Sequence, residues 1–154
     1  MELSDIVSPK GVLINLKANS KKQLLQELAS ALAPLAGVDE RAVFETLLQR
    51  ERLGSTGVGN GIAIPHGKLP KMDSIVGVFA QLAKPIDYDS MDDQPVDLVF
   101  VLLAPEGSGA DHLKALSRIA RLFRDSATLA QLRAETEIDT IYSLLTSNEK
   151  ATAA

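Results

Sequence analysis

Residues 96–104 read VDLVFVLLA, an apolar run that only one aspartate interrupts. A strand that alternates apolar and polar residues covers one face of a sheet, whereas a nearly continuous apolar run is typical of a strand buried on both faces. We therefore predict a central strand here, in a sheet that is covered by helices above and below.

The segments around this strand predict a single α/β domain. Further strands are expected at 12–16, 62–64 and 75–82, and a surface connection at 84–95. Apolar residues at helical spacing predict helices between Ser20 and Gly37, between Asp39 and Gly54, over 113–123, and around 127–134 and 137–146. The order β-α-α-β-β-β-α-α-α predicts a mixed β-sheet flanked by helices on both faces, and it leaves the order of the strands open.

Short polar residues predict how three of these helices begin. Ser20 and Gln23 have the spacing of a capping box, in which each side chain binds a backbone amide of the other residue. Asp39 is expected to cap the second helix. Ser108 and Asp111 have the capping-box spacing as well, in the loop PEGSG that follows the central strand.

Length, composition and charge limit the classes of function. The chain has 154 residues, a formal net charge of −4 and no cysteine, so we expect no nucleic-acid partner, no disulfide and no thiolate metal site. No apolar run approaches the roughly 20 residues that span a bilayer, so no membrane insertion is expected and the location should be cytoplasmic. We expect a domain over 1–147 and a flexible C-terminal tail over 148–154.

A second stretch, GSTGVGNGIAIPHGK at 54–68, presents one of the two histidines of the chain. Glycines before His66 let the backbone approach a ligand closely. Pro65 fixes its own φ angle and restricts the residue before it, so the backbone sets the orientation of the ring. This combination favours a functional imidazole over a polar surface residue.

Several kinds of chemistry do not fit the residues around His66. Two histidines without cysteine show no zinc-ligand spacing, and the nucleophile elbow G-x-S-x-G is absent. The phosphate-binding loop G-x-x-x-x-G-K-[ST] and the dinucleotide fingerprint are incomplete. A covalent nucleophile remains, since a neutral imidazole is nucleophilic at cellular pH.

The residues alone leave the roles of His112, Arg50 and Arg52 open. His112 stands in the first turn of a helix, either as a solvated residue or as a neutral imidazole that meets a phosphate there. Arg50 and Arg52 end the second helix, either as cations that complement its C-terminus or as guanidinium groups that bind phosphate oxygens. The two histidines are expected to lie at one rim of the sheet only if the fold brings their segments together.

Two long segments resemble one family of proteins. RERLGSTGVGNGIAIPHGKL at 50–69 resembles the phosphorylation-site segment of the enzyme IIA proteins of the phosphoenolpyruvate:sugar phosphotransferase system, in the fructose/mannitol class. QPVDLVFVLLAPEGSGADHLKALSRIARLF at 94–123 is similar to the second signature of that family. The likeness covers nearly the whole chain, and the sequence around the histidine resembles that of the nitrogen-related regulatory branch, enzyme IIA-Ntr.

The resemblance implies that His66 accepts a phosphoryl group at Nε2 from a phosphohistidine of an HPr-like carrier. His112 matches the second active-site histidine of the family, and Arg50 matches its site arginine. Phosphoryl transfer passes through a loose transition state, so the protein must align the reacting nitrogens and stabilise the oxygens. Backbone amides of the glycine-rich turn are further candidates for that stabilisation, and the residues concerned are Gly57, Gly59, Asn60 and Gly61. No metal and no cofactor is expected.

The same resemblance implies a regulatory function. In the nitrogen-related branch, the phosphorylation state governs binding to target proteins, among them potassium-transport and sensor proteins, and links to nitrogen metabolism. Three alternatives stay open. The chain could be an enzyme IIA for sugar transport that passes its phosphate to a separate IIB protein, an interaction module that is never phosphorylated, or a metal-assisted hydrolase.

Overall fold

One six-stranded mixed sheet organises the chain. The computed structural model describes residues 2–153, and side chains from 2 to 147; the tail predicted over 148–154 lies outside the residues whose side chains are described and stays a prediction. The strands are β1 (Val12–Leu16), β2 (Gly57–Gly59), β3 (Ile62–Ala63), β4 (His66–Leu69), β5 (Val76–Ile86) and β6 (Val96–Pro105). The helices are α1 (Lys21–Ala36), α2 (Glu40–Arg52), α3 (Gly109–Leu122), α4 (Ser126–Ala134) and α5 (Ile138–Ala153), preceded by the 3-10 helices η1 (Leu3–Asp5) and η2 (Pro9–Gly11).

Strand β6 is central, as predicted from its apolar run. The strand order is β1-β5-β6-β3-β2, and β4 also pairs with β6. β5 runs antiparallel to β6 along one edge, while β3 and β4 follow one another along the other edge, both parallel to β6. Ile62 lies opposite Leu98, and His66 lies opposite Leu102. The segment that carries His66 is therefore held by the most buried strand.

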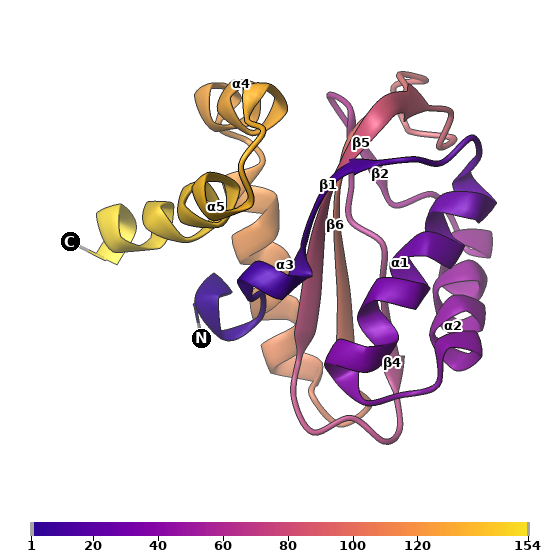
Figure 1. Cartoon of the computed structure of the whole chain (residues 1–154). Helices are drawn as coiled ribbons and strands as arrows, with labels where there is room; N and C mark the ends of the chain where they lie inside the picture. Colours follow the sequence, from indigo (N-terminus) through magenta and orange to yellow (C-terminus); the bar gives the residue numbers. More distant parts are fainter. Residues whose placement is uncertain (1, 154) are drawn as a thin grey trace.

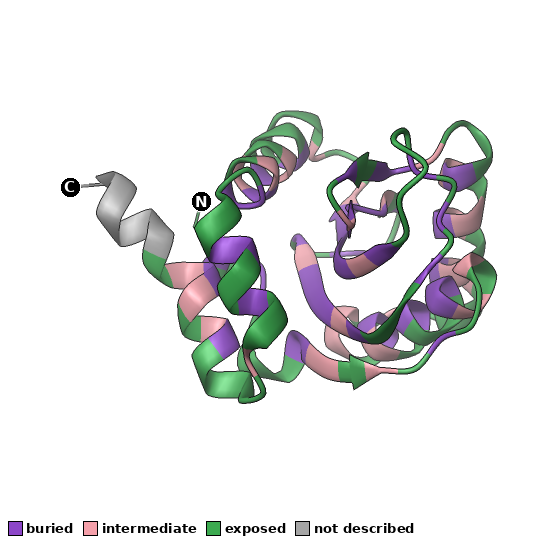
Figure 2. Cartoon of the chain, turned by 90° about the horizontal axis from the view of Figure 1, so that it is seen from above, coloured by how far each residue is buried: buried purple, intermediate pink, exposed green. Residues whose placement is uncertain are grey.

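Helices cover both faces of the sheet, which confirms the predicted architecture. Figure 1 shows α1 and α2 on one face and α3, α4 and α5 on the other. Figure 2 shows the buried residues gathered on the inner sides of these helices and along the strands. Within the described residues, no helix is both long enough and apolar enough to cross a membrane.

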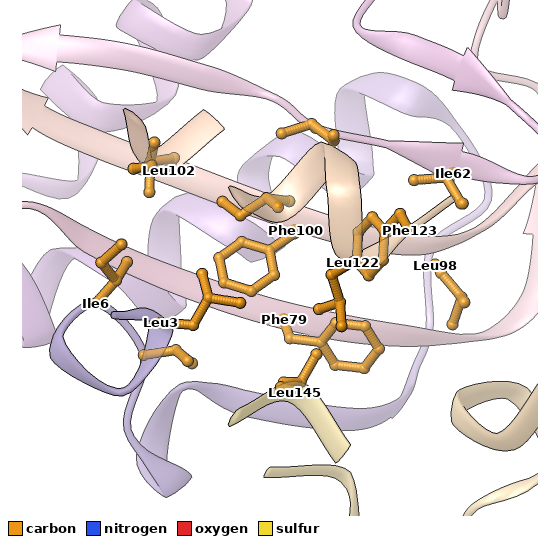
Figure 3. Close-up of a cluster of buried hydrophobic side chains, with 14 of the residues drawn as sticks. Leu3, Ile6, Ile62, Phe79, Leu98, Phe100, Leu102, Leu122, Phe123 and Leu145 are labelled. Atoms are coloured by element: carbon orange, nitrogen blue, oxygen red, sulfur yellow. The ribbon is translucent and has the colours of Figure 1, made fainter. Parts of the chain in front are cut away.

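The strands contribute side chains to two separate cores because successive residues point to opposite faces of the sheet. The core beneath α3 and α5 contains three phenylalanines (Figure 3), and the ring centroids of Phe79 and Phe100 each lie 6.3 Å from that of Phe123. The core beneath α1 and α2 contains the intervening residues of β6, among them Val99 and Val101. Burial on both faces explains the continuous apolar run.

The predicted N-caps at Ser20 and Asp39 are confirmed, whereas the capping box predicted at Ser20 and Gln23 forms only in part. Ser20 Oγ accepts the backbone N–H of Gln23 at 3.1 Å, while the Gln23 side chain accepts the N–H of Asn19 at 2.8 Å instead of that of Ser20. The Asp39 carboxylate accepts the N–H of Ala42 at 3.0 Å. Both caps satisfy backbone donors that the first helical turn leaves free.

The capping box predicted at Ser108 and Asp111 is wrong. The Ser108 hydroxyl donates to the carbonyl of Pro105 at 2.6 Å. Its side chain makes no capping bond to α3. The Ser108 hydroxyl thus closes the turn between β6 and α3. The Ser108 backbone carbonyl accepts the N–H of His112 at 2.8 Å, which is the first hydrogen bond of α3.

Two strands, β2 and β4, and the end of β5 were not predicted. β2 is glycine-rich and β4 reads HGKL, so neither shows the alternation that indicates a strand; pairing with β3 and β6 makes them strands. β5 continues to Ile86, into the segment expected as a surface connection. A register shift between Gln81 and Ile86 separates this end from the regular ladder.

We predict that Gly77→Ala destabilises the fold. A Cβ at residue 77 would lie 2.7 Å from the Phe100 ring and 2.9 Å from Ile6 Cγ2, so the aromatic core must shift. Overpacking of this kind costs about 1–3 kcal/mol of the free energy of unfolding, which urea denaturation measures. Gly107→Ala is the control, because a Cβ there meets nothing within 4 Å; equal midpoints for the two variants would contradict the packing described.

Candidate functional site

His66 is the first residue of β4, and its ring is held by the backbone just before it. Its Nδ1 lies 2.9 Å from the carbonyl oxygen of Ile64. A carbonyl only accepts hydrogen bonds, so Nδ1 carries the proton and Nε2 keeps its lone pair. The side chain is half-buried while the Pro65 ring beside it is buried. The fold therefore presents Nε2 as the free nitrogen.

The structure brings the two histidines together. His112 lies in the first turn of α3, which begins just after the C-terminal end of β6, and His66 pairs near the same end of that strand. The ring centroids are 5.5 Å apart and the ring planes are inclined at 66°. His112 is only 4% exposed, and among the described side chains its Nδ1 is one of the buried polar atoms without a hydrogen-bond partner. The two histidines thus meet at one rim of the sheet.

Burial keeps both imidazoles neutral at neutral pH. Desolvation lowers the pKa of His66 below its usual value, and the positive charge of Arg50 lowers it further. The hydrogen bond to Ile64 and the negative charge of Glu51 oppose this shift of the His66 pKa. Desolvation, with smaller effects of His66 and Lys68, lowers the pKa of His112 to about 4. A neutral imidazole has the lone pair that a protonated one lacks.

Arg50 reaches this region from the other face of the sheet. It lies in the last turn of α2, half-buried, and its Nη1 donates to the carbonyl of Gly54 at 3.0 Å. α2 packs closely on β4: a Cβ at Gly67 would lie 2.6 Å from Thr46 Cγ2. Arg50 therefore contributes its charge to the surroundings of His66, whereas Arg52 is exposed.

The glycine-rich turn lies elsewhere along β6. Asn60 and Gly61, with φ angles of 58° and 80°, form the tip of the β2–β3 hairpin. The Asn60 N–H donates to Asp92 at 3.0 Å, and the Gly61 carbonyl accepts from the N–H of Leu98 at 3.1 Å. Four residues of strand, about 13 Å, separate Leu98 from the register partner of His66.

The hairpin tip is therefore not brought to the two histidines. Gly59 has a φ of 100° and leads into this tip. Gly57, at the start of the hairpin, is buried, and a Cβ there would lie 2.3 Å from the Ser90 hydroxyl. The role predicted for the amides of these residues as phosphate donors stays a prediction.

A buried polar cluster behind His66 was missed by sequence reasoning. Glu51 is 8% exposed, and its carboxylate accepts the backbone N–H of Thr56 at 3.0 Å and the Thr56 hydroxyl at 2.5 Å. The Lys21 ammonium lies 3.0 Å from the same carboxylate and 4.5 Å from the centre of the Tyr88 ring. The Tyr88 and Thr56 hydroxyls are 3.1 Å apart.

We call these four residues, Lys21, Glu51, Thr56 and Tyr88, the Glu51 cluster. Burial and the charge of Glu51 raise the pKa of the Tyr88 hydroxyl far above its usual value, so the phenol stays protonated. In the sequence, Glu51 stands between two arginines in a helix end and resembles a solvated charge. The one sequence signal for this cluster was that Glu51 and Thr56 stand close together in the chain, on either side of the end of α2.

The arrangement suits chemistry on an anionic group. A neutral nucleophilic nitrogen lies beside a second neutral imidazole, near a guanidinium group and the N-terminus of α3. Among the described residues, no three side chains of histidine, cysteine, aspartate or glutamate gather as metal ligands.

Comparisons with known proteins agree with this chemistry. Residues 5–148 match the family model described as phosphoenolpyruvate-dependent sugar phosphotransferase system, EIIA 2. The chain is 63% identical over 145 residues to a nitrogen regulatory protein of Bradyrhizobium diazoefficiens, and the aligned residues cover 94% of this chain and 95% of the relative.

Solved structures show the same likeness. The crystal structure of the nitrogen regulatory protein IIA-Ntr from Neisseria meningitidis matches with a TM-score of 0.90 and 33% identity, over 94% of this chain and 99% of that one. The complex of enzyme IIA-mannitol and phosphorylated enzyme IIB-mannitol from Escherichia coli matches with a TM-score of 0.77 and 21% identity, over 90% of this chain and 95% of that one. The second likeness concerns the fold alone.

We predict that His112 makes the stability of the protein pH-dependent. Its pKa is about 4 in the folded state and has the ordinary value, 6.5, in the unfolded chain, so the unfolded state binds a proton first as the pH falls. The free energy of unfolding should therefore drop by about 2 kcal/mol between pH 7 and pH 5, and level off below pH 4. Urea denaturation of the protein and of His112→Gln across this range isolates the effect; parallel profiles would contradict the buried neutral imidazole.

Proposed function

Because the chain belongs to the EIIA 2 family of the phosphoenolpyruvate-dependent sugar phosphotransferase system, a family of phosphotransfer components, we propose that it carries a phosphoryl group on Nε2 of His66. The donor is the phosphohistidine of an HPr-like carrier protein. The observation that carries the proposal is the hydrogen bond from His66 Nδ1 to the Ile64 carbonyl, which leaves Nε2 as the free, unprotonated nitrogen.

The transfer requires one bond to form and one to break. The Nε2 lone pair of His66 attacks phosphorus while the phosphorus–nitrogen bond of the donor breaks, and the donor imidazole keeps that electron pair. The His66 ring gains positive charge as the new bond forms, and its Nδ1–H shares that charge with the Ile64 carbonyl oxygen. Because the transition state is loose, the protein acts mainly by alignment and by stabilising the phosphoryl oxygens.

Arg50 and His112 are the proposed groups for those oxygens. Arg50 supplies a positive charge from α2. His112 supplies a buried ring whose Nδ1 has no protein partner. When Nδ1 carries the proton, it can donate a hydrogen bond to a phosphoryl oxygen. His112 is buried and neutral, so it supports the transfer without competing for the phosphoryl group at an exposed nitrogen.

We also propose that the phosphorylation state regulates target proteins. The relatives named nitrogen regulatory protein support this reading. Two large apolar side chains near the site are exposed, Leu53 at 85% and Leu113 at 68%, and they offer a surface for a carrier or a target. Phosphorylation adds about −1.5 to −2 charges beside that surface. Potassium-transport proteins and sensor kinases are candidate targets, in addition to proteins of nitrogen metabolism.

Transfer to a separate IIB protein is the second candidate function. The shared fold with the enzyme IIA of the mannitol complex, which is bound there to a phosphorylated IIB, favours it. Loss of label from the phosphorylated chain on addition of a IIB protein distinguishes this function from regulation alone.

We predict that His66→Ala abolishes phosphoryl uptake and leaves the fold intact, because the replaced ring is half-buried at the rim of the sheet. Incubation with phosphoenolpyruvate, enzyme I and an HPr-like carrier, followed by intact mass, measures the gain of one phosphoryl group. The phosphate on the unaltered protein should be lost in acid and survive mild alkali, as a phosphoramidate does.

His112→Gln is the matched control for this experiment. It should slow the uptake and leave the phosphate on His66 in peptide mapping. Uptake by His66→Ala, or an acid-stable phosphate on Ser55 or Thr56, would overturn the assignment, and a native chain that gains no phosphate would be an interaction module.

We predict that a target protein covering His66 binds the unphosphorylated form at least tenfold more tightly. A buried dianion without a cation costs several kcal/mol, and about 1.4 kcal/mol suffices for a factor of ten. Titration of a target against both forms measures the ratio. His66→Asp should imitate the loss only in part, because it carries one charge on a shorter side chain; equal affinities of the two forms would rule out this switch for that target.

A further inference from the structure

The Glu51 cluster is joined to the His66 ring by a continuous series of hydrogen bonds. Glu51 accepts the Thr56 N–H at 3.0 Å. The Thr56 carbonyl accepts the N–H of Ile64 at 3.0 Å. The Ile64 carbonyl accepts the His66 Nδ1–H at 2.9 Å. The backbone groups of Thr56 and Ile64 connect the Glu51 carboxylate to the ring, so a displacement of Thr56 would displace the carbonyl that binds the imidazole.

Thr56 is held unusually firmly for a residue in a glycine-rich segment. Its N–H and its hydroxyl both bind the Glu51 carboxylate, and its hydroxyl also lies 3.1 Å from the Tyr88 hydroxyl. Between Thr56 and Ile64, three residues have positive φ angles: Gly59, Asn60 and Gly61. A segment of this kind has many accessible conformations, so its two ends need separate anchors.

The ion pair itself is a weak explanation for stability. The buried Glu51 carboxylate and the partly buried Lys21 ammonium group both lose hydration. Apolar residues of similar size often stabilise a fold as well as, or better than, a buried ion pair. The Glu51 carboxylate, however, gathers ligands from three directions: Lys21 of α1, the backbone and side chain of Thr56, and through Thr56 the phenol of Tyr88. This set is directional, and it holds Thr56, whose carbonyl binds the N–H of Ile64.

The charge of Glu51 also acts on the imidazole. It opposes the effect of Arg50 on the pKa of His66. Loss of this carboxylate would leave both Arg50 and Lys21 as uncompensated cations behind the ring. The basicity of Nε2 would then fall, in addition to any change of ring orientation.

We propose that Glu51 is a positioning residue for His66: its buried carboxylate clamps Thr56, and the hydrogen bonds through Ile64 hold the imidazole in the Nδ1–H tautomer that exposes Nε2. The inference rests on the proposed phosphoryl transfer for its consequence and on the hydrogen bonds alone for its geometry. Thr56 and Lys21 act in the same cluster, Thr56 as the connection and Lys21 as the counter-ion.

The test combines the tautomer of His66 with its phosphorylation rate. Nitrogen-15 NMR of the imidazole distinguishes the Nδ1–H from the Nε2–H tautomer, and the HPr-like carrier supplies the phosphoryl group for the rate. In Glu51→Gln we expect the Nε2–H tautomer to gain population, the His66 pKa to fall, and the rate to drop by at least about tenfold. Leu145→Ala is the stability control: this fully buried residue of α5, a helix that packs on β1 and η1, is expected to destabilise the fold without changing tautomer or rate.

Two variants of Thr56 keep the proposal testable if Glu51→Gln does not fold. Thr56→Val removes the hydroxyl that Glu51 accepts but keeps the backbone N–H, so its tautomer shift should lie between those of the native chain and Glu51→Gln. Thr56→Ser keeps both donors, and its tautomer population should be closer to that of the native chain.

The outcomes separate this inference from the proposed function. A native tautomer in Glu51→Gln overturns the positioning role, whatever the rate does; where that variant does not fold, a native tautomer in Thr56→Val does the same. A changed tautomer in a protein whose native form takes up no phosphate confirms the geometry and overturns the phosphoryl transfer instead.

Discussion

The parallel pairing of residues 62–69 with β6 is the constraint on which the site depends. β6 is buried on both faces, so a segment that pairs with it has little freedom along its length. Pro65 interrupts the ladder because it has no N–H, although its carbonyl still accepts the N–H of Leu102 at 3.0 Å. The chain bends there without leaving the strand, and the Ile64 carbonyl is left to accept the ring of His66.

The site also depends on both helical layers. Arg50 comes from α2 on one face of the sheet, and His112 comes from α3 on the other (Figure 1). β4 pairs with β6 alone, so the sheet ends at this strand and both layers can reach around it. A rearrangement of either layer would separate a supporting group from His66, whose own position is set by the sheet.

Electrostatics at this edge follow from partial burial. Desolvation keeps His66 and His112 neutral, which suits a nucleophile and a hydrogen-bonding neighbour but costs stability in acid. The only buried carboxylate in the described part of the chain, Glu51, is compensated by Lys21 and by two donors of Thr56. Charge is thus placed around the imidazole, while the imidazole itself stays uncharged.

The sequence by itself determined the layers and singled out the histidine that we propose as the nucleophile. The apolar run at 96–104 required a strand buried on both faces, and Pro65 with its neighbouring glycines marked His66, because both signals are local properties of the chain. The tertiary structure alone decided the rest. The contact between the two histidines joins residues 46 positions apart, and the strand β4 exists only by pairing with β6. Glu51 reads as a surface charge until Lys21 of α1 and Thr56 bind it. Only the register of β3 shows how far along the strand the glycine-rich tip lies from His66. Local pattern identified the buried strand β6 and the amphipathic helices, whereas the contacts between distant segments depend on which strands pair and in what order, and the periodicity of the sequence left that order open.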